Sequence, residues 1–402
     1  MNVLFLAPNY PAEMQDFTRG LAEVGARVYG IGDGHLRGLV PKVHRSLAAY
    51  RQAQLFDRDA TLAAARSFGV SFHRVECLWE PFVELAADLR EQLGVPGMSL
   101  DTARGFRDKE LMKERVEGAG LRVPHHARAS SGAEVRAAAA RIGFPLIIKP
   151  IAGAGSADTF RCDDPAALEA ALERTQHVKE LSVEEFVDGD EFTFDTVCIE
   201  GRPAYWNVAW YRPRPLISRT NEWVSPQVVV LRNPEQAELR GGVELGYGVL
   251  KALNMGSGYT HMEWYRKANG EVVFGEIGAR PGGARLVDEM NYSIDADLFR
   301  EWARAVCWGR FEARVERKYN VAIIFKRAQG QGRITHIDGL DTFMQKYRRH
   351  VVVEELLRPG TRRRDWKQTL LSDGYLILRH PDLASTLEMA DEFGERVQMY
   401  AE

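Results

Sequence analysis

The sequence has no apolar run approaching the roughly 18 residues that a membrane-spanning helix needs. Its opening run, Met1 to Ala7, is too short for a secretory signal and lacks a basic segment, so we expect a cytoplasmic protein without membrane contact. The 53 basic and 56 acidic residues leave a net charge of −3, which argues against a general nucleic-acid binder. The 4 cysteines lie far apart without C-x-x-C spacing, which favours buried thiols over zinc ligands or disulfides: Cys77, Cys162, Cys198 and Cys307.

Several familiar signatures are also missing. We find no internal repeat, no low-complexity tract and no nucleophilic triad. Residues 30–34 read G-x-G-x-G after the second expected strand, which is the wrong spacing and place for a dinucleotide fingerprint. Lys149 precedes the glycines of residues 153–155, whereas the lysine of a Walker A loop follows them. NAD binding and a P-loop are therefore not expected.

The length of 402 residues predicts two or three domains. Strand and helix patterns alternate from Val3 onward, which predicts a parallel-sheet α/β domain over residues 1–104. A helix from Arg107 to Val116 then opens a domain over residues 105–310, with a small lobe at about 125–190. Residues 311–402 are expected to form an α+β subdomain, with strands near 332–337, 351–356 and 374–379 and a helix over 384–400.

The segment 259–283 carries the clearest chemistry. Asn269-Gly270 between two apolar and aromatic runs predicts a β-hairpin with a two-residue turn. Counting outward from that turn places Glu263 opposite Glu276, and two facing carboxylates repel unless a cation lies between them. Mg²⁺ prefers such oxygen ligands and usually arrives with a nucleotide. The same parity places His261 and Arg280 on the carboxylate face. A surface hairpin with two solvated glutamates is the structural alternative.

Two further stretches could serve a nucleotide. Residues 146–149 form a buried strand that ends in Lys149, and the Gly153-Ala154-Gly155-Ser156 loop that follows could cover phosphates. The strand residues Glu184, Glu185 and Val187 could present an edge to adenine, and Glu191 could bind ribose hydroxyls. Taken singly, each stretch is equally consistent with an ordinary hairpin.

The order of these motifs resembles the ATP-grasp superfamily over roughly residues 105–300. The resemblance implies an ATP-grasp fold with a Rossmann-like pre-ATP-grasp domain in front and the nucleotide held between two α+β lobes. It implies that Lys109 and Lys149 contact the ATP phosphates under the loop containing Gly153, Gly155 and Ser156. It also implies adenine contacts from Glu184, Glu185 and Val187 beside Phe186, a ribose contact from Glu191, and metal contacts from Glu263 and Glu276.

One position departs from the common E-x-N-x-R pattern of the superfamily. Gly278 replaces the asparagine that supplies a third metal ligand, and the form E-I-G-x-R is similar to the branch of dipeptide-forming L-amino-acid ligases. Arg280 keeps its place and is the expected catalytic residue, binding a phosphoryl group or an acyl phosphate bidentately. A carboxylate substrate is expected, with less support, at His261, Gly282, Gly283 and Arg285, although residues 281–285 also suit a turn before a helix.

The resemblance implies an ATP-dependent carboxylate–amine ligase that uses Mg²⁺, with Mn²⁺ as a substitute, and acts on small carboxylate and amine substrates through an acyl phosphate. A biotin-carboxylase-like enzyme that activates bicarbonate and a non-catalytic nucleotide-binding protein are the alternatives. A homodimer is left open. The aromatic and basic segment 204–232 is expected to be an insertion rather than a pocket wall, with Tyr211, Arg214 and Arg219 among its residues.

Overall fold

The computed structural model describes residues 1–151 and 158–402 of the chain. The expected phosphate-covering residues Gly153, Gly155 and Ser156 therefore lie outside the described residues. None of the described helices is long and apolar enough to cross a membrane. All four cysteines are free and buried, which confirms the sequence-based expectation.

The N-terminal unit is a parallel four-stranded sheet with the order β3-β2-β1-β4. Residues 3–6 of β1 are all buried, as expected for a parallel strand covered on both faces. The strands are β1 (Asn2–Leu6), β2 (Arg27–Gly32), β3 (Leu47–Gln52) and β4 (Arg74–Glu76). The helices are α1 (Met14–Glu23), α2 (Pro41–Ser46), α3 (Arg58–Arg66), α4 (Val83–Leu93) and α5 (Leu100–Gly105).

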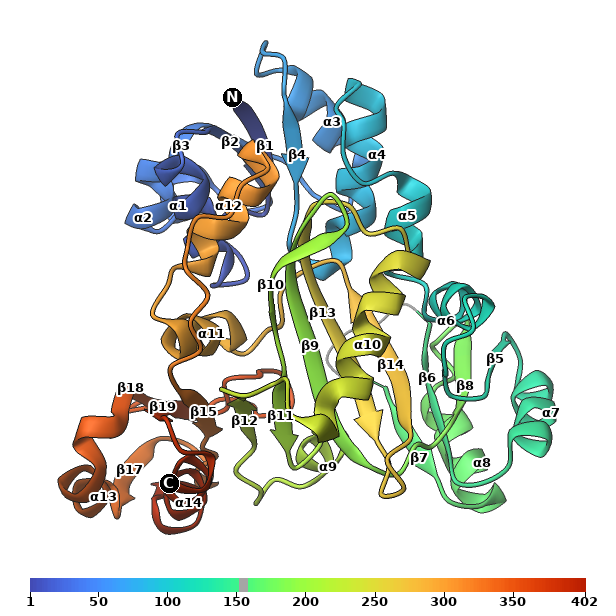
Figure 1. The fold of residues 1–402 in the computed structure, drawn as a ribbon, viewed down its shortest axis with the longest axis vertical. Coiled ribbons are helices and arrows are strands. Elements are labelled where there is room, and N and C mark those ends of the chain that lie inside the picture. Colours follow the sequence, from blue (N-terminus) through green and yellow to red (C-terminus); the bar gives the residue numbers. More distant parts are fainter. Residues whose placement is uncertain (152–157) are drawn as a thin grey trace.

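A small lobe follows, and Figure 1 shows it beside the hairpin of the large sheet. Its antiparallel sheet has the order β5-β8-β6-β7. Helix α6 begins where the Asp108 side chain accepts hydrogen bonds from the backbone N–H groups of Glu110 and Leu111. The elements are α6 (Lys109–Gly118), β5 (His126–Ala129), α7 (Gly132–Ile142), β6 (Leu146–Pro150), β7 (Phe160–Cys162), α8 (Pro165–Arg174) and β8 (Leu181–Glu185).

The largest sheet runs β14-β13-β9-β11-β12-β15-β19-β18, with β10 paired to β9. It therefore joins strands on both sides of residue 310 into one layer. Its strands are β9 (Asp190–Ile199), β10 (Arg202–Asn207), β11 (Ala209–Arg212), β12 (Gln227–Val230), β13 (Gly258–Arg266), β14 (Val272–Gly278), β15 (Asn320–Phe325), β18 (Val351–Leu356) and β19 (Gly374–His380). The helices connecting them are α9 (Pro215–Thr220), α10 (Ala237–Ala252), α11 (Leu286–Ile294) and α12 (Leu298–Trp308).

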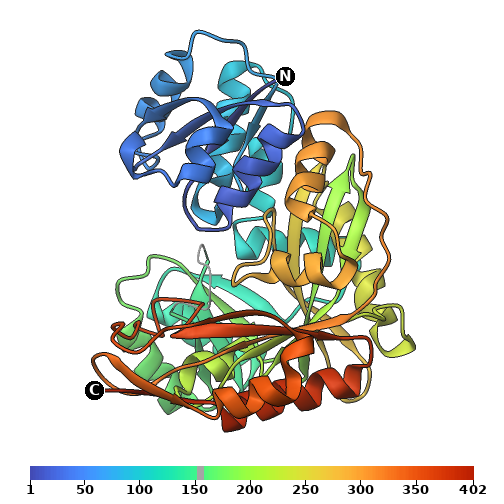
Figure 2. The same cartoon turned by 90° about the vertical axis from the view of Figure 1, so that its left-hand side faces the viewer.

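The C-terminal segment adds two helices and a small sheet. These elements are β16 (Gln329–Gly330), β17 (Ile334–Asp338), α13 (Leu340–Tyr347), α14 (Leu383–Arg396) and β20 (Gln398–Ala401). The sequence predicted a helix as far as residue 400, and this was wrong over its last turn. Residues 398–401 instead pair with β17, which buries Met399 and Ala401 in the core. Figure 2 shows α13 and α14 packed along one side of the large sheet.

The N-terminal unit is fixed to the large sheet through helix–helix packing of α1 on α12. A Cβ at Gly20 would lie 2.6 Å from the backbone oxygen of Phe299, so only glycine permits this approach. Phe17 fills the contact, with its ring 5.1 Å from the buried Trp302 ring. The two units thereby share one apolar core. This packing holds the loop after β4, which carries Glu80, at the mouth of the cavity described next.

Candidate active site

One cavity of about 700 Å³ lies where the N-terminal unit, the small lobe and the large sheet meet. Its walls include residues 10–14 and 78–80 of the N-terminal unit and residues 147, 149, 150 and 184–187 of the small lobe. The hairpin residues His261, Glu263, Glu276 and Arg280 also face it. The structure therefore gathers residues that are more than 250 positions apart in the sequence into one site.

The hairpin places its two glutamates as the sequence predicted. Glu263 on β13 is directly opposite Glu276 on β14, and His261 is opposite Gly278. Met262 and Ile277 form the neighbouring pair and point into the core, with exposed fractions of 0% and 2%. The carboxylate face therefore lines the cavity, and the solvated surface hairpin is not what the chain forms.

The register is right although the predicted turn is wrong. Arg266 pairs with Val272, and the backbone N–H of Lys267 donates to Glu271 O at 2.9 Å, so the loop contains three residues rather than two. Because of that extra residue, the pairs next to the loop, such as Arg266 with Val272, are one residue out of the predicted register. A bulge at Gly275 shifts it back before Glu276 is reached. A Cβ at Gly275 would lie 2.8 Å from Glu263 O, so glycine is what allows the bulge.

Two lysines from the small lobe neutralise Glu276. The Nζ atoms of Lys109 and Lys149 lie 3.3 Å and 3.7 Å from Glu276 Oε2. Burial alone would raise the pKa of Glu276, but these two ammonium groups lower it to about 2. Lys109 is at the start of α6 and Lys149 is in β6, so separate elements deliver the two charges. This is where the resemblance placed the phosphate-binding lysines.

Glu184 lies deeper, between two lysines. Its Oε1 is 2.7 Å from Lys113 Nζ and its Oε2 is 3.0 Å from Lys149 Nζ. Burial opposes the charge, yet the two ammonium groups hold the pKa of Glu184 well below its ordinary value. The carboxylate thus orients Lys149 toward the cavity. Lys113 carries no motif that sequence analysis would single out. A contact of Glu184 with adenine stays a prediction.

The expected adenine edge faces the same cavity from β8 and the loop after it. The Glu185 carboxylate is held 2.9 Å from Arg122, and the Val187 backbone oxygen accepts a hydrogen bond from Arg214 Nη1 at 2.8 Å. The Phe186 ring lies under the guanidinium of Arg214, 4.9 Å from it. All three residues line the cavity, but their contact with a base stays a prediction.

Arg214 also reaches Glu191, at the start of β9. Its Nε lies 3.3 Å from Glu191 Oε2. Burial, together with the charge of Glu263, raises the pKa of Glu191 to about 8. Tyr211 joins this region, with its Oη 3.4 Å from Glu263 Oε1. The expectation that residues 204–232 form an insertion away from the pocket was therefore wrong for Tyr211, Arg214 and Arg219, which line the cavity. The exposed Trp223 does fit that expectation.

Arg280 is held by an acid that the sequence did not reveal. Its Nε donates to Glu80, and its Nη1 donates to the backbone oxygen of Pro281 at 2.8 Å. Glu80 also binds Arg107, so one carboxylate joins two arginines. Burial would raise the pKa of Glu80, but the two guanidinium groups lower it. Glu80 is 200 positions from Arg280, and no local motif marks that pairing.

The glycine at position 278 has a structural role in that ion pair. A Cβ at Gly278 would lie 3.2 Å from Glu80 Oε2 and 3.4 Å from Arg280 Nε. A larger side chain would therefore press on both partners. Gly278 occupies the position at which the common pattern has asparagine. Because it has no side chain, it leaves room for the Glu80–Arg280 ion pair.

His261 is anchored from below the cavity floor. Its Nδ1 lies 2.6 Å from Asp195 Oδ1, and its Nε2 lies 3.6 Å from Glu263 Oε1. Burial alone would lower the pKa of His261, but Asp195 raises it to about 9. Gly282 passes close above, where a Cβ would be 3.0 Å from His261 Nδ1. His261 is thus a positive charge beside the glutamate pair at neutral pH.

The weakly supported carboxylate cradle is only partly present. Gly282 and Gly283 line the cavity, as expected. Arg285 does not line it; its Nη1 lies 3.7 Å from Asp288 Oδ2, at the start of α11. Arg285 has a φ of +66°, and this left-handed conformation leads into the helix. Residues 281–285 therefore form the turn that leads into α11, and Arg285 is not part of a carboxylate cradle.

The donor set suits a hard divalent cation. Glu263 and Glu276 face each other, and Glu191 is a third carboxyl group nearby, whose pKa is raised by its burial and then by the charge of Glu263. No cluster of three or more metal-ligating His, Cys, Asp or Glu side chains is arranged around one point in residues 1–151 and 158–402. The two facing glutamates would thus supply a minority of the ligands of Mg²⁺, as is usual when phosphates and water supply the rest.

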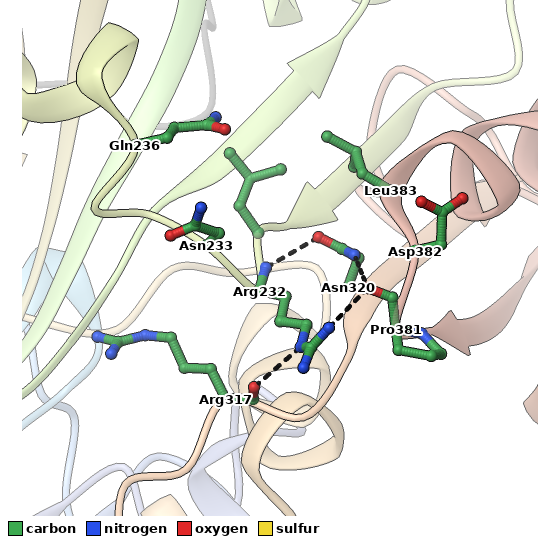
Figure 3. A pocket seen from close by; sticks show the side chains of 9 residues that line it. Arg232, Asn233, Gln236, Arg317, Asn320, Pro381, Asp382 and Leu383 are labelled. Atoms are coloured by element: carbon green, nitrogen blue, oxygen red, sulfur yellow. Dashed lines mark hydrogen bonds between the residues drawn. The ribbon is translucent and has the colours of Figure 1, made fainter.

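A second hollow, of about 540 Å³, lies between the end of β12 and the start of α14 (Figure 3). Its two arginine side chains, those of Arg232 and Arg317, already donate hydrogen bonds to backbone oxygens. Arg232 Nε donates to Arg317 O at 3.2 Å and its Nη1 donates to Pro381 O at 3.3 Å. Arg317 Nη2 donates to Trp206 O at 2.8 Å. These contacts hold loops together, and we assign the hollow no chemistry.

Comparison with known proteins supports the reading of this geometry. No family model matches the sequence. An L-arginine-specific L-amino acid ligase from Bacillus subtilis is 27% identical over 205 residues, which cover 49% of each chain. A D-alanine–D-alanine ligase from Ralstonia nicotianae is 30% identical over 170 residues, covering 36% of this chain and 51% of the relative. The chain thus spans about half the length of the curated relatives it matches.

The fold agrees over the whole chain. The crystal structure of an L-amino acid ligase from Bacillus licheniformis superposes with a TM-score of 0.81 at 20% identity, covering 100% of this chain and 98% of that one. The chain therefore has the ATP-grasp fold, as the sequence predicted. An alanine–anticapsin ligase from Bacillus subtilis is a further relative by sequence, 26% identical over 255 residues, which cover 58% of this chain and 53% of the relative.

Proposed function

We propose that this protein is an ATP-dependent carboxylate–amine ligase, which forms an amide bond through an acyl phosphate and releases ADP and phosphate. The observation that carries the proposal is the single cavity in which Lys109 and Lys149 flank the facing pair Glu263 and Glu276, with Arg280 beside them. ATP with Mg²⁺ or Mn²⁺ would supply the phosphoryl group and the charge neutralisation for its transfer. Such chemistry needs positioning and electrostatics more than a nucleophilic side chain.

Each side chain has a role that its position allows. Lys109 and Lys149 would hold phosphate oxygens, since both ammonium groups already face the cavity. Glu263 and Glu276 would hold the metal. Arg280 keeps Nη2 for a phosphate or carboxylate, because its Nε and Nη1 are bound to Glu80 and Pro281. Nη2 carries two N–H donors, so this one nitrogen could still meet two oxygens of such a group.

The nucleotide would lie with its base against residues 184–187 and its ribose near Glu191. Arg214 now contacts both Val187 and Glu191, so a bound nucleotide would have to share or displace this side chain. The raised pKa of Glu191 means that a protonated carboxyl would be available to hydroxyl groups at neutral pH. These assignments rest on the resemblance and on the shared cavity.

The substrates would be a small carboxylic acid and a small amine, and a soluble cytoplasmic enzyme fits the absence of apolar segments in the sequence. The decisive experiment measures ADP release from Mg-ATP over a panel of amino acids, singly and in pairs. Release that requires both an acid and an amine supports the ligase. Release with bicarbonate alone would favour the biotin-carboxylase-like alternative, and ATP binding without any release would favour a non-catalytic protein.

A further inference from the structure

Two arginines at one end of the cavity lack an acidic partner. Arg219 is on α9 and Arg327 follows β15, and both line the cavity. Within the part of the chain that the structure describes, Arg219 makes no hydrogen bond or ion pair. Arg327 Nη1 donates to the backbone oxygens of Ser218 and Asn221 at 2.8 Å each and of Glu222 at 3.5 Å, and its Nε donates to Ser372 Oγ at 3.4 Å. Its guanidinium lies 4.3 Å from the ring of Trp366.

The nearby acids are already bound to a different arginine. Arg363 Nη2 lies 2.9 Å from Glu222 Oε1, and Arg363 Nε lies 3.6 Å from Asp373 Oδ2. The buried Asp373 also accepts hydrogen bonds from the backbone N–H groups of Ala328 and Arg364. Arg219 and Arg327 therefore remain as an excess of positive charge at this end of the cavity.

Burial makes that excess costly. It lowers the pKa of Arg219, and it lowers the pKa of Arg327 to about 10, with the charge of Arg219 acting in the same direction and the charges of Glu222 and Asp373 opposing it only in part. Both side chains are half-buried, and two like charges in such a place are stabilised by a bound anion. Guanidinium groups match the planar geometry of a carboxylate. The arrangement is thus incomplete without an anionic ligand.

An apolar surface connects these arginines with the reaction centre. In the sheet order, Val228 on β12 and Phe325 on β15 come between β11 and Arg327, and both line the cavity. Tyr211 on β11 also lines it, and its hydroxyl is 3.4 Å from Glu263. A ligand that reaches from Arg280 toward α9 would therefore cross a mainly apolar wall before it meets the two arginines. The cavity therefore has positive charge at both ends and an apolar wall between them. Its complement is a ligand with an anionic group at each end.

We propose that Arg219 and Arg327 bind a second carboxylate of the acid substrate, so that the ligase acts on acidic amino acids or related dicarboxylates. The proposal rests on the ligase function argued above and adds the class of its substrate. It predicts that L-glutamate or L-aspartate is preferred over L-glutamine or L-asparagine, which have nearly the same shape without the charge.

The test uses the full chain and an Arg219→Glu variant. Arg219 has no bonds to lose, so the fold should be retained; the control is Arg240→Glu, the same change of charge at an exposed site on α10. Binding of the four amino acids is measured by calorimetry with Mg²⁺ and a non-hydrolysable ATP analogue. ADP release is measured in parallel. An Arg327→Met variant, checked by its melting curve, provides a second test of the pair.

The expected result is tighter binding of an acidic amino acid than of its amide by at least about 10-fold, roughly the contribution of one charge-assisted hydrogen bond. Arg219→Glu should abolish that preference, and Arg240→Glu should keep it. Equal binding of acid and amide by the unaltered chain would overturn the proposal. So would an Arg219→Glu variant that changes only the KM for ATP, because the arginines would then serve the nucleotide.

The two proposals fail in different ways. Charge-selective binding without ADP release from any acid and amine would leave the anion site standing and remove the ligase function. ADP release with neutral amino acids, together with equal binding of acids and amides, would leave the ligase function standing and remove the anion site.

Discussion

Replacing Arg280 with lysine should remove most of the turnover while ATP still binds. Arg280 uses Nε for Glu80 and Nη1 for Pro281 O, which leaves one nitrogen to reach the cavity. A lysine has a single ammonium group and cannot both keep the Glu80 contact and meet two oxygens of a phosphoryl group. Loss of one preorganised donor at a developing charge typically costs about 100-fold to 1,000-fold in rate, or roughly 3 to 4 kcal/mol.

The stability effect should be smaller. Glu80 keeps Arg107, so its carboxylate is not left buried without a partner, and the loss should be about 1 to 3 kcal/mol, as for one hydrogen bond to a charged group. Single-turnover acyl phosphate formation and a melting curve are measured on the same preparation. The control is Glu80→Gln, which disturbs the same ion pair but keeps the guanidinium. Near-normal chemistry with a lowered melting temperature in Arg280→Lys would refute a catalytic role.

The remaining predictions concern the glutamates, the phosphate lysine and the histidine. Glu263→Gln should impair turnover at limiting Mg²⁺ far more than folding, since it relieves repulsion between the facing carboxylates. Glu276→Gln should impair turnover as well and should also lower stability, because it removes the ion pairs with Lys109 and Lys149; full activity of both variants would refute the metal platform. Lys149→Ala should raise the KM for ATP, and unchanged nucleotide affinity in calorimetry would contradict that role. Because the folded pKa of His261 is about 9, its pairing with Asp195 should stabilise the fold fully below about pH 6.5 and lose that contribution, at most about 3 kcal/mol, as pH rises through 9. Urea unfolding of the unaltered chain and of His261→Gln should therefore differ more at pH 6.5 than at pH 10.

Much of the site was visible in the sequence because it depends on local order. The facing glutamates follow from strand parity on either side of Asn269-Gly270, and Lys149 follows from the buried strand that ends in it. Even so, the pairing of Glu263 with Glu276 was predicted correctly only because two errors cancelled: the loop is one residue longer than predicted, and an unpredicted bulge restores the register. The sequence signal for a tight turn does not show a three-residue loop, and the Gly275 bulge that restores the register has no signal apart from the glycine itself.

The partners of these residues were not visible, because they come from elements far away in the chain. Glu80 holds Arg280 across 200 positions, and Lys113 holds Glu184 across the small lobe. Arg214 appeared to be part of an insertion, since nothing local links it to Glu191. Ion pairs of this kind depend on where separate domains dock, and docking is set by packing such as that of Gly20 on α12.

The sequence by itself determined the alternating N-terminal unit, the hairpin face that carries Glu263 and Glu276, and the expectation of an ATP-grasp fold, because each depends on periodicity or on motif order along the chain. Only the tertiary structure decided that the strands beyond residue 310 extend the same sheet and that Arg219 and Arg327 form no ion pair with any acid in residues 1–151 and 158–402. It also decided that Gly278 makes room for the Glu80–Arg280 pair. The physical reason is that burial and charge balance belong to positions in space, and neighbours in space are fixed only when the whole chain has packed.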